Sequence, residues 1–291
     1  MPMPSAMSSA TSPAALPDAD GLLARLAEVA LAAGAAIRRI EAGGIAAELK
    51  ADQSPVTLAD GAAEEIICAA LATLLPGVPV IAEEAMAAGG PAAAAMADRL
   101  AGGGAFLLVD PLDGTREFIS GNGEYTVNIA LVEGGAPVLG VVYAPARALL
   151  YAGRPGSAFR ASRAPTDPVA AADWPPIASR PVPGGPTPVA ASRSHGDPAT
   201  DALIARYPVA ERIPAGSALK FGLLAEGRVD LYPRLGTVME WDSAAGHALV
   251  TAAGGSVSRP DGTPLTYGHP ETGFRVHGFV AWGRRDGSAQ G

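Results

Sequence analysis

Apolar residues recur along the chain at two different spacings, and these spacings predict the order of its helices and strands. A first helix is predicted from Asp20, which suits an N-cap, up to Gly43 and Gly44. Its apolar positions follow a helical period: Leu22, Leu23, Leu26, Val29, Ile37 and Ile40. After a loop at residues 50–55, a second helix is predicted by Ile66, Ile67, Leu71 and Leu74.

Short apolar runs predict strands in the first half of the chain. They lie at residues 78–82, 106–109, 125–132 and 137–143. Glu133-Gly134-Gly135 separates the last two runs, and this composition favours a hairpin turn. Residues 86–104 are rich in alanine and glycine and predict only a short helix or a surface excursion.

The second half begins near residue 160 with a proline-rich, irregular connection. Beyond it we expect strands at residues 188–192 and 229–232, and helices at 199–206, 218–226 and 242–253. Strands and helices do not alternate regularly, which favours layered α/β or α+β sheets over a Rossmann fold. We expect lobes at residues 18–160 and 161–286, a disordered tail at 1–17 and a short tail at 287–291.

The composition narrows the class of protein. The 291 residues are 48% apolar and suit one large domain or two closely packed lobes. A net charge of −8 argues against a nucleic-acid polymer as partner but allows a small phosphorylated ligand held beside cations. No segment is apolar and long enough to span a membrane, and residues 1–17 lack the basic start of a secretory signal. Cys68 is the single cysteine, which fits a reducing cytosol, so we expect a cytoplasmic protein.

One segment carries the most chemistry, and it follows the strand predicted at residues 106–109. It places two carboxylates three residues apart, with a proline between them and then a glycine and a hydroxyl: Asp110-Pro111-Leu112-Asp113-Gly114-Thr115. Magnesium prefers hard oxygen ligands, and a glycine before a helix lets backbone N–H groups approach a phosphate. The segment therefore suggests a metal and phosphate site. An ordinary Asp-Pro turn is the alternative.

Other acids also lie at the ends of predicted elements. Glu83 and Glu84 follow an apolar strand, Asp242 opens a helix, and Asp60 follows Thr57 with the spacing of a capping box. Each has a simpler interpretation, as a solvated loop or as a helix cap that contributes about 0.5–2 kcal/mol. Carboxylates that share one site repel each other, however, and divalent cations would relieve the repulsion.

Two motifs together resemble the paired signatures of the inositol-monophosphatase-like, lithium-sensitive, magnesium-dependent phosphatases. They are the segment at residues 110–115 and Glu240-Trp241-Asp242-Ser243-Ala244-Ala245-Gly246. Further motifs resemble one branch, the bacterial 3′(2′),5′-bisphosphate nucleotidases of sulfate assimilation. These motifs lie at residues 50–57, 123–131, 192–195, 216–221 and 231–234. The resemblance runs in order from about residue 20 to residue 282.

The resemblance implies a fold and a set of roles. The fold would be an α-β-α-β-α layered sandwich. The metal ligands would be the side chains of Glu83, Asp110, Asp113 and Asp242 and the carbonyl of Leu112. Two or three Mg²⁺ ions would bind, with Mn²⁺ as a substitute and Li⁺ as an inhibitor.

The resemblance also implies which residues act on the substrate. Asp60 and Thr115 would orient and deprotonate the attacking water, with Glu84 helping to orient its neighbours. The backbone N–H groups of Gly114 and Thr115 would hold the scissile phosphate, and Asp242 would also border the substrate.

Substrate selection would fall to the second half, where Ser194, His195, Lys220 and Arg234 are the candidates for a second phosphate. Lys220 could equally be a solvated helix lysine, and His195 could simply close a loop. The implied reaction removes the 3′-phosphate of adenosine 3′,5′-bisphosphate, or of its phosphosulfate analogue. An inositol or sugar monophosphatase and a catalytically silent phosphate-binding protein stay open as alternatives, as do a monomer and a homodimer.

Overall fold

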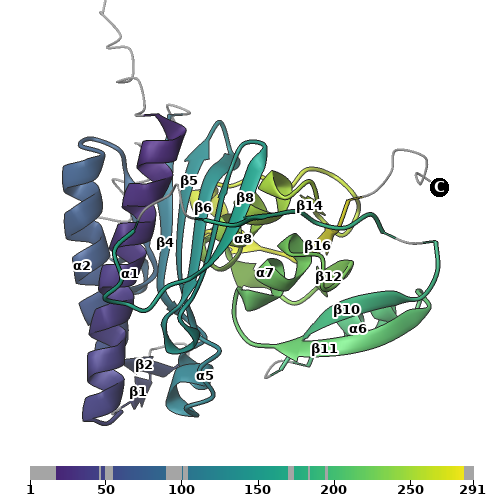
Figure 1. The fold of residues 1–291 in the computed structure, drawn as a ribbon, viewed down its shortest axis with the longest axis horizontal. Helices are drawn as coiled ribbons and strands as arrows, with labels where there is room; N and C mark the ends of the chain where they lie inside the picture. Colours follow the sequence, from purple (N-terminus) through teal and green to yellow (C-terminus); the bar gives the residue numbers. More distant parts are fainter. Residues whose placement is uncertain are drawn as a thin grey trace, which may run out of the picture.

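The computed structural model describes residues 18–45, 47–49, 55–89, 100, 104–169, 174–182, 184–193 and 196–284. The tails expected at residues 1–17 and 287–291 lie outside these ranges, as does most of the segment at 86–104. Two large β-sheets and the helices that pack on them make up most of the described chain (Figure 1).

The first sheet has seven strands in the order β3-β4-β5-β6-β7-β8-β9. Their bounds are β3 (Val80–Ala82), β4 (Phe106–Asp113), β5 (Thr126–Glu133), β6 (Ala136–Ala144), β7 (Leu149–Arg154), β8 (Ser157–Ser162) and β9 (Pro176–Ile177). β3 and β4 are parallel, and all other neighbours are antiparallel. The predicted hairpin between β5 and β6 is confirmed. The sequence analysis missed β7 and β8, because glycine, serine and arginine interrupt their apolar pattern.

Two long helices cover one face of this sheet, as the helical periods predicted. They are α1 (Ala19–Gly43) and α2 (Leu58–Leu74), at the left of Figure 1. Helix α1 begins with Asp18 in the N-cap position, two residues before the predicted cap. The apolar stripes of both helices are buried against the sheet in one cluster, which includes Leu26, Ile37, Ile67, Val109, Ile129 and Tyr143.

The second sheet has five strands in the order β11-β10-β12-β16-β14. Their bounds are β10 (Thr187–Ser192), β11 (Val209–Ala215), β12 (Leu231–Arg234), β14 (Ser256–Ser258) and β16 (Phe279–Trp282). Helices α7 (Leu219–Ala225) and α8 (Glu240–Ala252) lie between the two sheets, and α6 (Pro198–Ile204) packs on the outer face of the second (Figure 1). The layers therefore follow the order α-β-α-β-α, which confirms the expected fold.

Helix α8 approaches the first sheet closely because two strand positions beneath it are glycines. A Cβ atom at Gly140 of β6 would lie 2.3 Å from the carbonyl oxygen of Ala245. A Cβ atom at Gly153 of β7 would lie 2.8 Å from the Cα atom of Leu249. These two glycines let the backbone of α8 rest directly on the sheet.

Smaller elements complete the described chain: β1 (Ala47–Leu49), β2 (Pro55–Thr57), α3 (Glu83–Ala87), α5 (Thr115–Ile119), β13 (Val238–Met239), β15 (Arg275–Val276) and 3-10 turns at Pro145–Arg147 and Pro270–Thr272. None of the described helices is long and apolar enough to cross a membrane. The division into lobes at residue 160 stays a prediction.

Candidate active site

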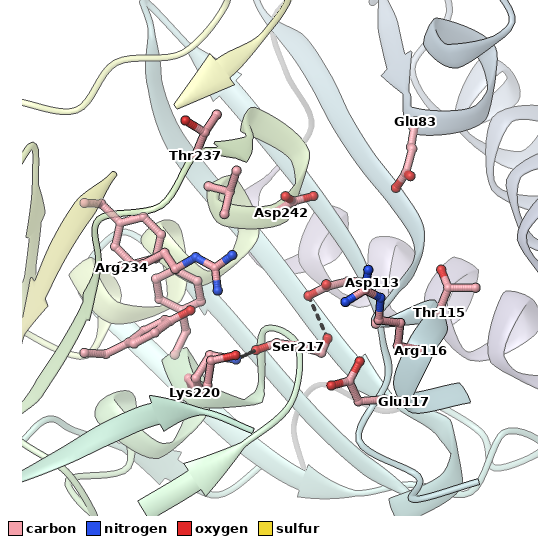
Figure 2. A pocket seen from close by; sticks show the side chains of 16 residues that line it. Glu83, Asp113, Thr115, Arg116, Glu117, Ser217, Lys220, Arg234, Thr237 and Asp242 are labelled. Carbon is pink, nitrogen blue, oxygen red and sulfur yellow. Dashed lines mark hydrogen bonds between the residues drawn. The ribbon is translucent and has the colours of Figure 1, made fainter. Parts of the chain in front are cut away.

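Three of the predicted acids meet at one point between the two sheets. Glu83 is the first residue of α3, Asp110 lies in β4, and Asp242 lies in the first turn of α8. One carboxylate oxygen from each lies within 4.8 Å of the others. Figure 2 shows the carboxylates of Glu83 and Asp242 turned toward the same space, with Asp113 nearby. Segments more than 100 residues apart in the sequence therefore form one cluster of carboxylates.

The strand that carries Asp110 continues farther than the sequence predicted. β4 extends to Asp113 and stays paired with β5, with an irregular register between Asp110 and Asp113. Asp110 is buried, and its Oδ1 accepts a hydrogen bond of 3.0 Å from the backbone N–H of Leu112. The irregularity places both carboxylates at the same end of the sheet, although the strand does not stop between them.

Asp113 is held by two donors from different parts of the chain. Its Oδ2 accepts a hydrogen bond of 2.6 Å from the Ser217 hydroxyl and one of 3.3 Å from the Asn128 amide. Ser217 precedes α7 and Asn128 lies in β5, so the carboxylate is fixed from both sides. Asp113 lines the same cavity as Glu83 and Asp242.

Burial and mutual repulsion shift the pKa values of these acids upward. Burial raises the pKa of Asp110 well above its usual range, and the carboxylates of Glu83, Asp113 and Asp242 raise it further. The pKa of Asp242 is raised well above its usual range for the same reasons, with burial first. Burial also raises the pKa of Asp113, although Ser217 and Lys220 counteract it. A cluster of one buried and several partly buried carboxylates, whose like charges repel one another, fits a divalent cation, which prefers oxygen ligands.

Asp60 caps α2 and also contacts Thr115, whereas its role toward a water stays a prediction. Its Oδ2 accepts hydrogen bonds of 2.7 Å from the backbone N–H and the hydroxyl of Thr57, which confirms the capping box of α2. Its Oδ1 accepts a hydrogen bond of 3.3 Å from the hydroxyl of Thr115. The helix cap therefore also holds the hydroxyl that borders the cavity.

Gly114 connects β4 to α5 in a left-handed conformation, with φ of 90°. This backbone region favours glycine, so the residue type follows from the turn itself. Thr115 begins α5, and its hydroxyl lies 3.5 Å from the carbonyl oxygen of Leu112. The roles of Gly114 and Thr115 toward a phosphate stay predictions.

Glu83 and Glu84 begin α3, whereas the sequence predicted only that they follow a strand. The carboxylate of Glu64 in α2 accepts hydrogen bonds of 2.8 Å from the backbone N–H groups of Glu84 and Ala85. Glu64 thus fixes the start of the helix that presents Glu83. The sequence analysis missed Glu64, which is one of several acids in the predicted helix and has no local motif.

Two cations lie on the other side of the cavity from Glu83 and Thr115 (Figure 2). Lys220 is buried, so its interpretation as a solvated helix lysine is wrong. Its Nζ donates hydrogen bonds of 3.2 Å to the carbonyl of Ala215 and 2.7 Å to that of Ser217, and burial lowers its pKa to about 8. The Nε of Arg234 is buried and has no hydrogen-bond partner among the described residues. Both side chains offer N–H donors to an anion in a cavity of about 260 Å³.

The remaining candidates, Ser194 and His195, lie outside the described residues. The sequence analysis singled out neither Ser217 nor Glu117, although both line the cavity. Ser217 lies within a motif that carried the resemblance, and that motif was the available signal.

The comparisons with known proteins agree with this geometry. The model of the inositol monophosphatase family matches residues 18–277. The chain belongs to the inositol monophosphatase family. The resemblance stated from the sequence motifs is thereby confirmed, and membership implies dependence on a divalent metal, for which the carboxylate cluster is suited.

Relatives and solved structures within the family point to one branch. The chain is 40% identical over 262 residues to the 3′(2′),5′-bisphosphate nucleotidase CysQ of Escherichia coli K12. This match covers 88% of this chain and 99% of the relative. The crystal structure of CysQ from Bacteroides thetaiotaomicron matches with a TM-score of 0.77 and 33% identity, over 92% of this chain and 99% of that one. An inositol monophosphatase from Anabaena shares the fold, with a TM-score of 0.65 and 24% identity over 91% of each chain.

Proposed function

We propose that this chain is a magnesium-dependent phosphomonoesterase that hydrolyses the 3′-phosphate of adenosine 3′,5′-bisphosphate to give AMP and phosphate. The phosphosulfate analogue is a second substrate of the same kind. The observation that carries the proposal is the arrangement of the cavity, in which Glu83, Asp113 and Asp242 lie across from the cations Lys220 and Arg234 (Figure 2). The relatives that cover most of the chain are named as nucleotidases of this specificity.

The carboxylate side of the cavity would bind the metal and the scissile phosphate. Glu83, Asp110, Asp113 and Asp242 would hold the cation with the carbonyl of Leu112. Bound Mg²⁺ supplies charge neutralisation and a more acidic water. We propose two or three Mg²⁺ ions, replaceable by Mn²⁺ and inhibited by Li⁺, in a cytoplasmic enzyme that is a monomer or a homodimer.

The hydroxyl of Thr115 and the carboxylate of Asp60 would act on the attacking water. The Thr115 hydroxyl donates to Asp60, which leaves the oxygen lone pairs of Thr115 as acceptors for a water in the cavity. The water forms the new bond to phosphorus and passes a proton to this pair, while the bond from phosphorus to the 3′ oxygen breaks. The 3′ oxygen takes up a proton to become the hydroxyl of AMP. Glu84 would support Glu83 from the next position of α3.

The cationic side would hold the second phosphate. Lys220 uses two of its three N–H donors on backbone carbonyls, which leaves one for an anion. Arg234 brings a buried Nε for which the described part of the chain offers no acceptor, and such a donor is costly unless a ligand satisfies it. A 5′-phosphate would satisfy both side chains.

The test compares phosphate release from adenosine 3′,5′-bisphosphate, adenosine 3′-monophosphate and inositol 1-phosphate, each with magnesium. We expect the highest kcat/KM with the bisphosphate. Arg234→Gln should lower kcat/KM for the bisphosphate by about 10–100-fold, the size of a lost charge-assisted hydrogen bond, and leave the value for the 3′-monophosphate within about threefold.

Each alternative gives a different outcome. A preference for inositol 1-phosphate would retain the metal site and show that the second phosphate has been assigned wrongly. Equal losses on both nucleotides in Arg234→Gln would remove Arg234 from 5′-phosphate binding. A folded protein without magnesium-dependent turnover of any phosphomonoester would indicate a silent phosphate-binding protein.

A further inference from the structure

We propose that Glu124 is a positioning residue, which holds Ser217 against Asp113 and thereby sets the metal-binding orientation of that carboxylate. This inference rests on the proposed function, because it takes Asp113 as a ligand of the cation. Glu124 does not itself line the cavity, so it acts through the turn at residues 215–217.

The carboxylate of Glu124 joins three segments of the chain. Its Oε2 accepts hydrogen bonds from Arg193 Nε at 2.7 Å and from the backbone N–H of Gly216 at 2.8 Å. Its Oε1 accepts from Arg193 Nη2 at 2.9 Å and from Arg147 at 2.8 Å. Glu124 precedes β5 of the first sheet, whereas Arg193 and Gly216 follow β10 and β11 of the second. The two sheets are therefore connected here by one buried carboxylate with four donors.

The turn that Glu124 holds has little freedom to move. A Cβ atom at Gly216 would lie 2.8 Å from atoms of Glu117 and Glu124, so the backbone is pressed against both side chains. Ser217 has a φ of 52°, a left-handed conformation that costs about 1–3 kcal/mol for a residue with a side chain. Such a conformation persists only when its surroundings impose it. Here Glu124 holds the N–H of Gly216, and Lys220 holds the carbonyl of Ser217 (Figure 2).

The strained conformation aims the Ser217 hydroxyl at the site. The hydroxyl donates to Oδ2 of Asp113 at 2.6 Å and contacts the hydroxyl of Thr126. Asn128 donates to the same Oδ2, so both donors leave Oδ1 of Asp113 for the cation. If Gly216 loses its acceptor, Ser217 can relax, and among the described residues Asn128 is then the remaining hydrogen-bond donor that orients Asp113.

The chain contains a matched control for this arrangement. Asp230 is also a buried carboxylate with a paired arginine: Arg180 donates to it from Nε at 2.5 Å and from Nη2 at 2.9 Å. The arginine side chains of both pairs are 43% exposed. Asp230 and Arg180 contribute nothing to the lining of the cavity. A purely structural role for Glu124 therefore predicts that the two pairs behave alike.

The experiment uses the full chain with four changes: Glu124→Gln, Ser217→Ala, the double variant and Asp230→Asn. In Glu124→Gln, either orientation of the amide places an NH₂ group against two of the four donors. Calorimetric titration of the metal-free proteins with Mg²⁺ gives the dissociation constant, urea unfolding gives stability, and kcat and KM are measured on the bisphosphate.

We expect Glu124→Gln to weaken Mg²⁺ binding about tenfold and to lower kcat by about 10–100-fold, as for a misplacement of about 1 Å. Asp230→Asn should lose similar stability but keep both values within about twofold. In the Ser217→Ala background, Glu124→Gln should change Mg²⁺ binding by less than twofold, because the effect passes through Ser217. If Glu124→Gln does not fold, Arg193→Lys replaces it, since one ammonium cannot make both guanidinium contacts.

Two results would overturn the inference: fully additive effects of Glu124→Gln and Ser217→Ala on Mg²⁺ binding, or equal losses of Mg²⁺ binding in Glu124→Gln and Asp230→Asn. The titration needs no substrate. A wild-type chain that binds Mg²⁺ without hydrolysing the bisphosphate would therefore refute the proposed substrate alone, and the comparison of dissociation constants would still decide the role of Glu124.

Discussion

Replacing Gly140 by alanine tests how the sheet places a metal-binding side chain. The new Cβ atom would lie 2.3 Å from the carbonyl oxygen of Ala245 and 2.9 Å from the Cβ atom of Ala248, both in α8. Neither neighbour is a flexible side chain that can turn aside, so the helix itself must move. A return to ordinary van der Waals contact requires a shift of about 1 Å.

The shift of the helix has two consequences, a loss of stability and a larger loss of activity. Overpacking of a close-packed interior costs about 1–3 kcal/mol, which a domain with a stability of about 5–15 kcal/mol survives. Asp242 lies one helical turn before Ala245 in α8, so the shift also moves its carboxylate relative to Asp110. A misplacement of about 1 Å costs about 100-fold in rate. Gly140→Ala should therefore fold and lose activity out of proportion to its stability.

The assay measures urea unfolding and kcat/KM for the bisphosphate in three glycine-to-alanine variants that differ in how closely the new Cβ atom approaches its neighbours. Gly61→Ala is the control, because among the described residues no atom outside the backbone of α2 and the neighbouring positions lies within 4 Å of its Cβ position, and we expect a gain of about 0.5–1 kcal/mol in stability. Gly153→Ala should fall between the two, since its Cβ atom would lie 2.8 Å from Leu249, farther along α8 from Asp242. Wild-type stability and activity in Gly140→Ala would refute the reasoning.

Three further predictions concern Asp110, the proposed metal site and a partly buried histidine. Asp110→Asn should abolish turnover and the rise in melting temperature on adding Mg²⁺, yet stabilise the metal-free protein by about 2 kcal/mol because it removes a buried charge. A calorimetric scan with and without Mg²⁺ measures both effects on the melting temperature. A retained rise with Mg²⁺ would contradict the assignment of Asp110 as a metal ligand. Lithium should inhibit at modest concentrations at which sodium has no effect, and equal responses to the two ions in the phosphate-release assay would count against the proposed metal site. Burial lowers the pKa of His247 to about 4 from 6.5. As the pH falls, this histidine is therefore protonated in the unfolded chain before it is protonated in the folded one. The free energy of unfolding should decrease between pH 6.5 and pH 4, by about 3 kcal/mol over the whole range. Urea unfolding at pH 7.5 and 5 should show this loss in the wild type and a smaller one in His247→Gln, and identical losses would show that other groups cause it.

The elements and acids with local signals were predictable from the sequence. The helical stripes of α1 and α2, the hairpin between β5 and β6, and the capping box of Asp60 each depend on residues a few positions apart. Periods and caps of this kind act over one or two turns, so one segment is enough to reveal them. Chemistry suggested that acids from separate segments share a cation site, because repelling carboxylates need a shared cation, and the family resemblance named Glu83, Asp110 and Asp242 among the ligands.

The residues that orient the proposed metal ligands could not be predicted in the same way, because their contacts join distant parts of the sequence. Glu64 reaches the start of α3, Ser217 reaches Asp113, and Glu124 reaches Gly216, over 20, 104 and 92 residues of sequence respectively. Each is an ordinary residue type in its own segment, and only the packing of the layers brings it to its partner. The ligands carry a chemical signature, whereas the residues that orient them are defined by tertiary contacts. A sequence that keeps the metal ligands but alters Glu124 or Ser217 would still match the two acid motifs at residues 110–115 and 240–246, and we expect it to bind its metal poorly.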